Sequence, residues 1–273
     1  IFTDRFPAFS YGDQVQVERE VAKGKGGYYL REAKVSKVSE VSNAFLKLRA
    51  RILDIYESNL PEPHDGLLAG IVLGTKKNLD PKFAEALINT GTIHIVVASG
   101  TNITIFAGGL MFILINIFKT HRRTAVLASI IFIWVYIFFI GFQPPIVRAG
   151  IMGTIAFTGQ ILGKEGDGMR ALIISAFLML LAIPQWLFDL GFQLSFLATA
   201  GIILFSKRIS EVVPIRANGL LGPISNGMRE VLAMTLAAQV AVLPLIYYKF
   251  GGFSLLSPVV NVLVVPIVPF IMA

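Results

Sequence analysis

Three residues have the side chains of a hydrolytic triad: Ser99 as nucleophile, His94 as base and Asp189 as the group that orients the base. Hydrolases that work inside membranes exist. However, the sequence VVASGTN around Ser99 lacks the G-x-S-x-G turn that exposes a nucleophilic serine. His94 and Ser99 are five residues apart, near opposite sides of a helix. A hydrolase therefore stays an alternative, which Ser99→Ala would separate from a pore lining or a tight turn.

Asp189 also belongs to the stretch PQWLFDLGFQLSFLATAGIILFS, residues 184–206. About 20 apolar residues at 1.5 Å each span a bilayer core of roughly 30 Å, so this stretch is long enough to cross a membrane. Asp189 and Gln193 are four residues apart and would share one face of a continuous helix. A carboxylate at the centre of a membrane helix costs on the order of 2.5–3.5 kcal/mol. We therefore expect Asp189 to face protein or a wet cavity.

Arg148 is the expected partner of Asp189. Each residue lies a few positions into an apolar segment that enters from the same side, at a depth of roughly 5–6 Å. An ion pair would explain how the membrane tolerates both charges. The pair could act on a transport path or only lock two helices together. Polar residues at similar depth predict an outward-facing vestibule, and the candidates for its lining or polar network are His94, Ser99, Asn102, Arg148, Asp189, Gln193 and Asn261.

Metal, thiol and cofactor chemistry find no support. The chain has no cysteine, which excludes disulfides and thiol catalysis. The three histidines, His64, His94 and His121, are isolated and lack the spacing of metal ligands. His94 could equally form a hydrogen bond at the membrane surface with no role in transport. We expect no cofactor and, for this stretch of chain, no catalytic activity.

Composition predicts an integral membrane protein with a soluble appendage. The chain has 273 residues, of which 55% are hydrophobic and only 15% charged, whereas soluble domains average about 25% charged residues. Residues 1–92 hold 13 of the 24 basic and 12 of the 17 acidic residues. The net charge of +7 therefore lies mostly in the later, apolar part, where it reports orientation in the bilayer.

Hydropathy divides the chain into three parts. Residues 1–42 alternate like β-strands and resemble the end of a small β barrel. Residues 43–92 form amphipathic and interfacial helices, and residues 93–273 form a polytopic membrane domain. The predicted fold is mainly α, with about seven spans preceded by a partial β barrel. Because the chain starts without Met and ends in an apolar run, we expect a fragment truncated at both ends. The apolar segments lie near 95–118, 124–141, 145–162, 169–183, 185–206, 229–247 and 254–273.

Basic and aromatic side chains mix in the strand-like part. Barrels that bind single strands combine these residue types, since cations attract phosphates and rings stack on bases. A solvated hairpin with two aromatic residues packed inward explains the same pattern. The candidates for DNA contact are Lys23, Lys25, Tyr28, Tyr29 and Arg31.

Basic loops fix the predicted orientation. Nine Lys and Arg residues fall in the loops after the first, third and fifth apolar segments, whereas the opposite loops hold only Lys249. The positive-inside rule places the basic loops in the cytoplasm and residues 1–42 outside.

Several motifs resemble the ComEC competence family. The apolar stretch ending in Leu73-Gly74 precedes Gly91, His94 and Ser99-Gly100, as in that family. The segment WLFDLGFQLSFLATAGI, with Asp189 and FQLSF at residues 192–196, is similar to its most recognisable block. Arg148, Asn261 and Pro266 fit further family positions. The chain departs from the family at Thr101-Asn102, where Leu-His is usual, and at Thr75, where an acidic residue is common.

The resemblance implies a multi-pass channel in the bacterial inner membrane that passes single-stranded DNA inward during natural transformation. It also implies a barrel of OB type outside, an extracellular DNA receptor and an ATP-driven motor in the cytoplasm as partners. The lipid bilayer is the surrounding partner, and the oligomeric state stays open. The remaining alternative is a small-molecule transporter, because broken helices with Gly and polar residues also mark substrate sites there. The two halves of the sequence show no internal repeat, which weakens the transporter alternative.

The orientation is testable with topology reporters. A reporter that is active only outside the cytoplasm should work when fused near Gly26 or Gly251, and it should be silent at Arg122 or Arg208. A cytoplasmic reporter at the same four sites provides the complementary control. Activity of the external reporter at Arg122 would overturn the orientation.

Overall fold

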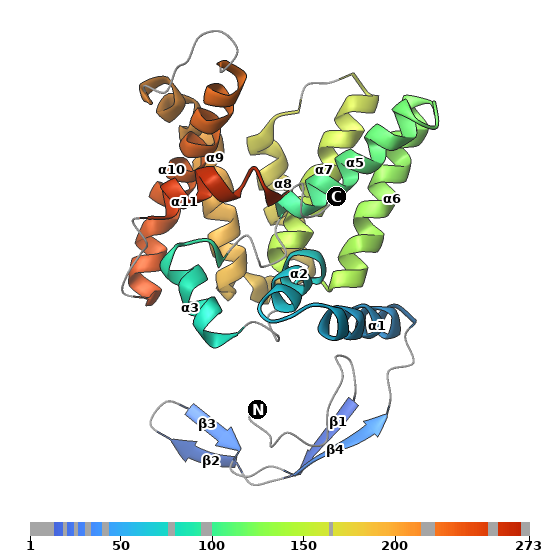
Figure 1. The fold of residues 1–273 in the computed structure, drawn as a ribbon, viewed down its shortest axis with the longest axis vertical. Helices are drawn as coiled ribbons and strands as arrows, with labels where there is room; N and C mark the ends of the chain where they lie inside the picture. Colours follow the sequence, from blue (N-terminus) through green and yellow to red (C-terminus); the bar gives the residue numbers. More distant parts are fainter. Residues whose placement is uncertain are drawn as a thin grey trace. The chain divides into compact units, whose positions relative to one another are not determined.

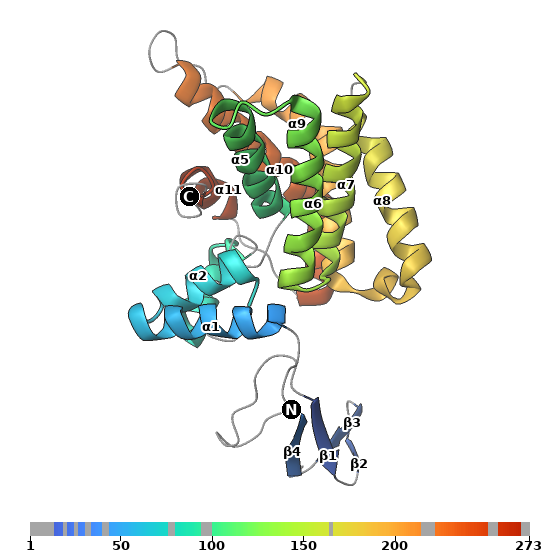
Figure 2. The same cartoon turned by 90° about the vertical axis from the view of Figure 1, so that its right-hand side faces the viewer.

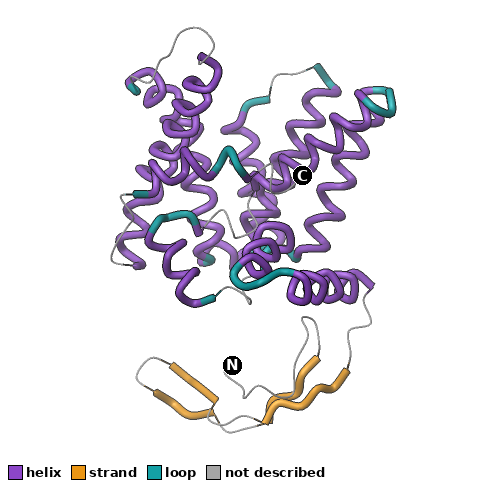
Figure 3. The backbone as a smooth tube through the Cα atoms, viewed as in Figure 1, coloured by secondary structure: helices purple, strands orange, loops and turns teal. Residues whose placement is uncertain are grey.

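The computed structural model describes residues 14–18, 21–24, 27–30, 34–39, 44–75, 80–93, 100–163, 166–213, 222–250 and 256–268. The chain divides into two compact units, residues 1–60 and 61–273. Helix dominates the described residues, and their strands all lie in the first unit (Figures 1 and 3). The expected mainly α fold with a β segment at its start is confirmed.

The described strands of the first unit form two antiparallel pairs. β1 (Gln14–Glu18) pairs antiparallel with β4 (Lys34–Ser39), and β2 (Val21–Gly24) pairs antiparallel with β3 (Gly27–Leu30). The result is two separate two-stranded sheets. A two-stranded ribbon cannot close, because a barrel needs a ring of strands that share all their edges. The expected partial barrel is therefore not seen among the described residues.

One helix follows these strands in the first unit. α1 spans Ala44–Asn59 and lies in the part of the chain, residues 43–92, where helices were expected. It ends before Pro61, because a proline disfavours the helical conformation in the residue that precedes it.

The second unit is helical in its described residues. Every apolar segment expected in 93–273 contains a helix. Within the described ranges, only α6, α9 and Ser225–Lys249 of α10 are long and apolar enough to cross a membrane by themselves. The number of spans stays a prediction. The elements are α2 (His64–Leu73), α3 (Pro81–Asn89), α5 (Gly100–Asn116), α6 (Arg122–Ile140), α7 (Pro144–Ile161), α8 (Gly168–Ala182), the 3₁₀ turn η1 (Pro184–Phe188), α9 (Leu190–Val212), α10 (Gly222–Phe250) and α11 (Ser257–Val264).

Side-chain caps explain several helix starts. The carboxylates of Asp80, Asp167 and Asp189 accept backbone N–H groups in the first turns of α3, α8 and α9, at 2.8–3.2 Å. Such caps satisfy donors that have no partner within the helix. Proline occupies the first turn of α3, α7 and α11, where a missing N–H costs nothing.

The core of the second unit lies between consecutive helices. α5, α6, α7 and α8 pack one against the next, and α10 packs along α9 and against α11 (Figures 1 and 2). α9 also contacts α7 and α8, so both groups of helices share one interior. The buried cluster contains Ile103 and Ala107 from α5, Ile133, Ile137 and Ile140 from α6, Ile146 and Val147 from α7, Met179 from α8 and Phe192 from α9.

The outer faces of these helices are also apolar. Ile131 on α6 and Phe177 and Leu181 on α8 are 64%, 65% and 70% exposed. A soluble protein rarely exposes so many large apolar side chains together. A bilayer removes this cost, which agrees with the expected membrane protein.

Two glycines allow close helix contacts. A Cβ atom on Gly201 of α9 would lie 2.5 Å from the carbonyl oxygen of Ala237 in α10. A Cβ atom on Gly150 of α7 would lie 2.2 Å from Cδ1 of Ile137 in α6. Gly108 and Gly109 of α5 differ, because no atom lies within 4 Å of an added Cβ there. Close packing thus explains Gly150 and Gly201.

This difference yields a stability test with a matched control. Gly201→Ala should lower the free energy of unfolding by about 1–3 kcal/mol, because the obstructing atom belongs to the backbone of α10. Gly108→Ala should be neutral or stabilising, since Ala favours helix by up to about 1 kcal/mol. Unfolding followed by circular dichroism in detergent measures both. Equal effects of the two changes would contradict the close α9–α10 contact.

Candidate functional site: buried polar groups at helix ends

α2 ends inside the second unit. Its residues Ile71 and Leu73 are buried, and Gly74 closes the helix in the left-handed conformation with φ of 66°. The last carbonyl groups of a helix have no donor within the helix. In an apolar interior they need donors from elsewhere, because an unpaired buried carbonyl costs about 1–3 kcal/mol.

Three side chains from other elements supply those donors. Asn102 Nδ2 on α5 donates to the Ile71 carbonyl at 2.8 Å. Tyr136 Oη on α6 donates to the Val72 carbonyl at 3.0 Å. Gln143 Nε2, just before α7, contacts the Gly74 carbonyl at 3.5 Å. The end of α2 is therefore held by α5, α6 and the α6–α7 connection.

This arrangement brings in two residues that the sequence did not single out. Tyr136 lies in an otherwise apolar run, and Gln143 precedes two prolines at a helix start. A lone hydrogen-bonding side chain in an apolar segment was the available signal. Nothing in the spacing indicated that the acceptor would be the backbone of residues 71–74, more than sixty positions away.

Arg148 occupies the junction of α5, α7 and α9. One guanidinium nitrogen donates to the Ser195 carbonyl, and the guanidinium lies 6.0 Å from the centre of the Phe196 ring. A Cβ on Gly100, at the start of α5, would lie 3.2 Å from another guanidinium nitrogen. Arg148 Nε is buried and has no hydrogen-bond acceptor among the residues that the structure describes. The cation is thus stabilised by one backbone dipole and one aromatic face.

The expected ion pair between Arg148 and Asp189 is wrong. Asp189 lies before α9 rather than within a helix, because η1 ends there and the chain becomes extended. Its Oδ1 accepts the Phe192 N–H at 2.8 Å, and the residue is exposed. Among the described residues, Arg148 has no carboxylate partner. The carboxylate of Asp189 instead caps its own helix, α9.

Two further candidates make local contacts. Gln193 Nε2 donates to the Leu187 carbonyl in η1 at 2.8 Å, so it fixes the bend before α9. Asn261 on α11 is buried, with Nδ2 3.3 Å from Ser257 Oγ and Oδ1 without a partner. Asn261 is therefore a buried polar group, but the described contacts do not join it to Asn102 or Arg148.

The remaining candidates are His94, Ser99 and the residues proposed for DNA contact. His94 and Ser99 lie outside the described residues, as do Lys25 and Arg31. Lys23, Tyr28 and Tyr29 lie on the β2–β3 ladder, where Lys23 is opposite Tyr28 and Ala22 is opposite Tyr29. The described residues contain no group of three or more His, Cys, Asp or Glu that could hold a metal ion. A role of the strand residues in DNA contact stays a prediction.

Comparison with known proteins decides the family. Residues 71–273 match the family described as "Competence protein". The chain belongs to the competence protein family. It is 27% identical over 225 residues to ComE operon protein 3 of Bacillus subtilis (strain 168), covering 82% of the chain and 27% of that protein. It is 24% identical to the uncharacterized protein YcaI of Escherichia coli (strain K12), covering 82% of the chain and 30% of that protein.

An uncharacterized protein of Aquifex aeolicus (strain VF5) is also 24% identical, over 67% of the chain and 45% of that protein. The chain thus spans less than half the length of these relatives. No solved structure matches it. Membership of the competence protein family confirms the resemblance to ComEC.

The structure gives the FQLSF block of this competence protein a physical meaning. Phe192 is buried in the core, and its ring centre lies 4.3 Å from that of Phe196. Phe196 and the Ser195 carbonyl are the two groups that Arg148 contacts. α9 therefore packs against α7 through residues of this block.

The α2 anchor can be tested with two asparagines of one helix. Asn102→Ala should lower the free energy of unfolding by about 1–3 kcal/mol, because the Ile71 carbonyl loses its donor in a buried place. Hydrogen exchange in residues 66–73 should accelerate. Asn116→Ala is the control, since Asn116 is exposed and its side chain donates to the Phe112 carbonyl of its own helix, at 3.0 Å. Unchanged exchange in α2 of the Asn102 variant would rule out the anchor.

Proposed function

We propose that this protein is part of an inner-membrane channel that passes single-stranded DNA into the cytoplasm during natural transformation. The match to the competence protein family over residues 71–273 is the observation that carries the proposal. The relation to ComE operon protein 3 supports it further. The apolar outer helices support a location in the membrane.

The geometry of the second unit supports passage of a polyanion. A buried arginine without a carboxylate partner is costly in an apolar interior, so proteins keep such a cation where it is used. Arg148 is half-buried at the junction of three helices, and among the described residues no carboxylate pairs with it. A DNA phosphate that passes nearby would gain a charge-assisted interaction with it. We assign Arg148 the role of lowering the free-energy barrier to passage of the DNA phosphate backbone through the membrane.

The partners belong to the proposal as well. An extracellular DNA receptor would deliver the strand to residues 1–42, and an ATP-driven motor would act at the basic cytoplasmic loops. Lys23, Lys25, Tyr28, Tyr29 and Arg31 remain the candidates for the first contact with DNA. The described hairpin offers backbone for such a contact but not the closed barrel that the resemblance implied.

A small-molecule transporter is the second candidate, and one observation favours it. α2 is a half-length helix that ends inside the helical unit, as broken helices of transporters do. The hydrolase alternative is weaker, because Asp189 caps α9 and is exposed. We propose that the chain acts without catalysis.

Deletion and complementation test the function. A deletion strain should still bind DNA at its surface but should not import it into the cytoplasm. Complementation with Arg148→Gln should lower import on the order of tenfold or more, because a hydrogen bond to a charged group contributes about 1.5–3 kcal/mol. Arg148→Lys should retain part of the activity. Import is measured as labelled DNA that survives nuclease treatment of the cells.

Arg170→Gln is the matched control. Arg170 on α8 pairs with Asp167 at 2.9 Å, and its side chain is 82% exposed, so its loss should not change import. Immunoblots of the membrane fraction separate lost folding from lost transport. Normal transformation of the deletion strain together with a defect in solute uptake would favour the transporter.

A further inference from the structure

Two hollows lie where the C-terminal half of α9 meets the N-terminal half of α10, on different faces of α9. The first has a volume of about 460 Å³ and is lined by Arg208, Ile209, Val212, Val213 and Leu236. The second has a volume of about 250 Å³ and is lined by Ser206, Lys207, Ser210, Glu211, Glu230, Ala233 and Met234. The first is an open hollow on the surface of the two helices rather than an enclosed cavity.

The two hollows differ in charge. Among the described residues, Arg208 is the only charged residue that lines the first hollow, and none of the lining residues is a carboxylate. Lys207 in the second hollow is accompanied by Glu211 and Glu230, so the signs are mixed. The lining of the first hollow is almost wholly apolar, so a ligand gains from the charge of Arg208 only where an anionic part extends beyond that lining to the guanidinium. The mixed signs around the second hollow give no such preference.

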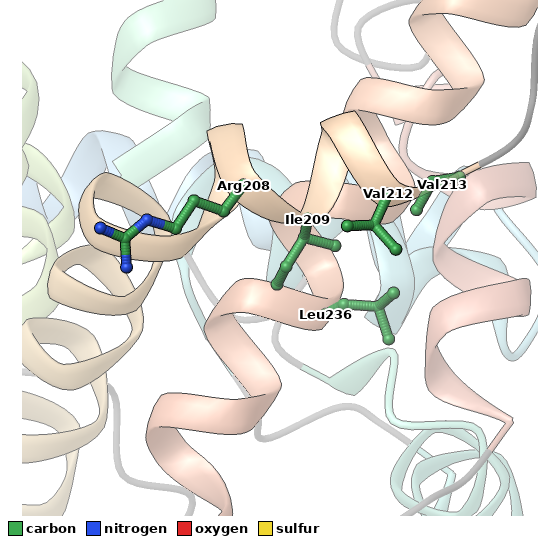
Figure 4. A pocket seen from close by; sticks show the side chains of 5 residues that line it. All are labelled: Arg208, Ile209, Val212, Val213 and Leu236. Carbon is green, nitrogen blue, oxygen red and sulfur yellow. The ribbon is translucent and has the colours of Figure 1, made fainter.

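The shape of the first hollow separates apolar from charged contact. Ile209, Val212 and Leu236 gather between the two helices, while the Arg208 side chain extends its guanidinium away from them (Figure 4). Val212 is 81% exposed. Exposed apolar surface beside a cation suits a molecule with a hydrocarbon part and an anionic part.

We propose that this first hollow, named here the α9–α10 hollow, binds one anionic phospholipid. An acyl chain lies along Ile209, Val212 and Leu236, and the phosphate lies at Arg208. The positive-inside pattern places this end of α9 at the cytoplasmic leaflet, where anionic lipids and basic residues meet. Bound lipid would brace the cytoplasmic ends of the two longest described helices.

Quenching of tryptophan fluorescence by brominated lipids tests the site. Trp134→Phe and Trp186→Phe remove the two tryptophans of the chain. In this background Val212→Trp reports on the α9–α10 hollow, and Met234→Trp reports on the second hollow, where Met234 is 46% exposed. Each protein is reconstituted in phosphatidylcholine vesicles that contain a minor share of brominated phosphatidylglycerol or brominated phosphatidylcholine.

Brominated phosphatidylglycerol should quench the Val212→Trp reporter with an apparent affinity about fivefold higher than brominated phosphatidylcholine, since one basic residue contributes roughly that factor. The Met234→Trp reporter should show no preference. Arg208→Gln should remove the preference at Val212→Trp, and Leu236→Gln should weaken quenching by both lipids. Size-exclusion chromatography and circular dichroism check that each variant is folded.

Three results would overturn the proposal. They are equal quenching by both lipids at Val212→Trp, a preference that survives Arg208→Gln, and absence of quenching, which would mean that protein such as a second copy covers the hollow. Should Arg208→Gln fail to fold, the comparison of the two lipids at Val212→Trp still decides, because it leaves Arg208 intact. The result is independent of DNA import, so it does not depend on the proposed function.

Discussion

Backbone carbonyl groups at the end of α2 must find donors within an apolar interior, and this constraint governs the second unit. A short helix that ends inside a membrane protein is tolerated only where protein groups satisfy its free backbone. Asn102, Tyr136 and Gln143 do so from three separate elements. Side chains from α5, α6 and the start of α7 meet at residues 71–74. The same three elements also contribute to the buried cluster that contains Ile137.

Arg148 imposes a second requirement on the same helices. Its guanidinium needs an acceptor at the α7–α9 contact, and the Ser195 carbonyl in the second turn of α9 supplies it. Asp189 does not accept a hydrogen bond from Arg148. The 3₁₀ turn η1 ends just before α9, and the Asp189 carboxylate accepts the Phe192 N–H at the start of α9. The FQLSF block therefore combines core packing at Phe192 with support of the cation at Ser195 and Phe196. One stretch of α9 thus meets two different physical needs.

Sequence patterns predicted those features that depend on neighbouring residues. Asp80 before Pro81 matches the start of α3, and Pro61 follows the end of α1, because caps and breakers act within a few positions. The Arg148–Asp189 pair failed because it assumed that a helix continues through Asp189. Asn102 was identified as polar, but its acceptor was not, since backbone acceptors leave no trace in composition. The predicted partial barrel is not seen among the described residues, because alternation predicts strands but not how many of them pair side by side.

The two arginines of α7 and α8 differ in how their charges are balanced. Arg170 is paired with a carboxylate at the surface, where water already screens the charge and a pair adds little. Arg148 is half-buried and, among the described residues, has no carboxylate partner, although a missing partner costs more away from water. The proposed path for a negatively charged chain would account for this difference, because a fixed carboxylate beside Arg148 would neutralise the field that a phosphate would meet.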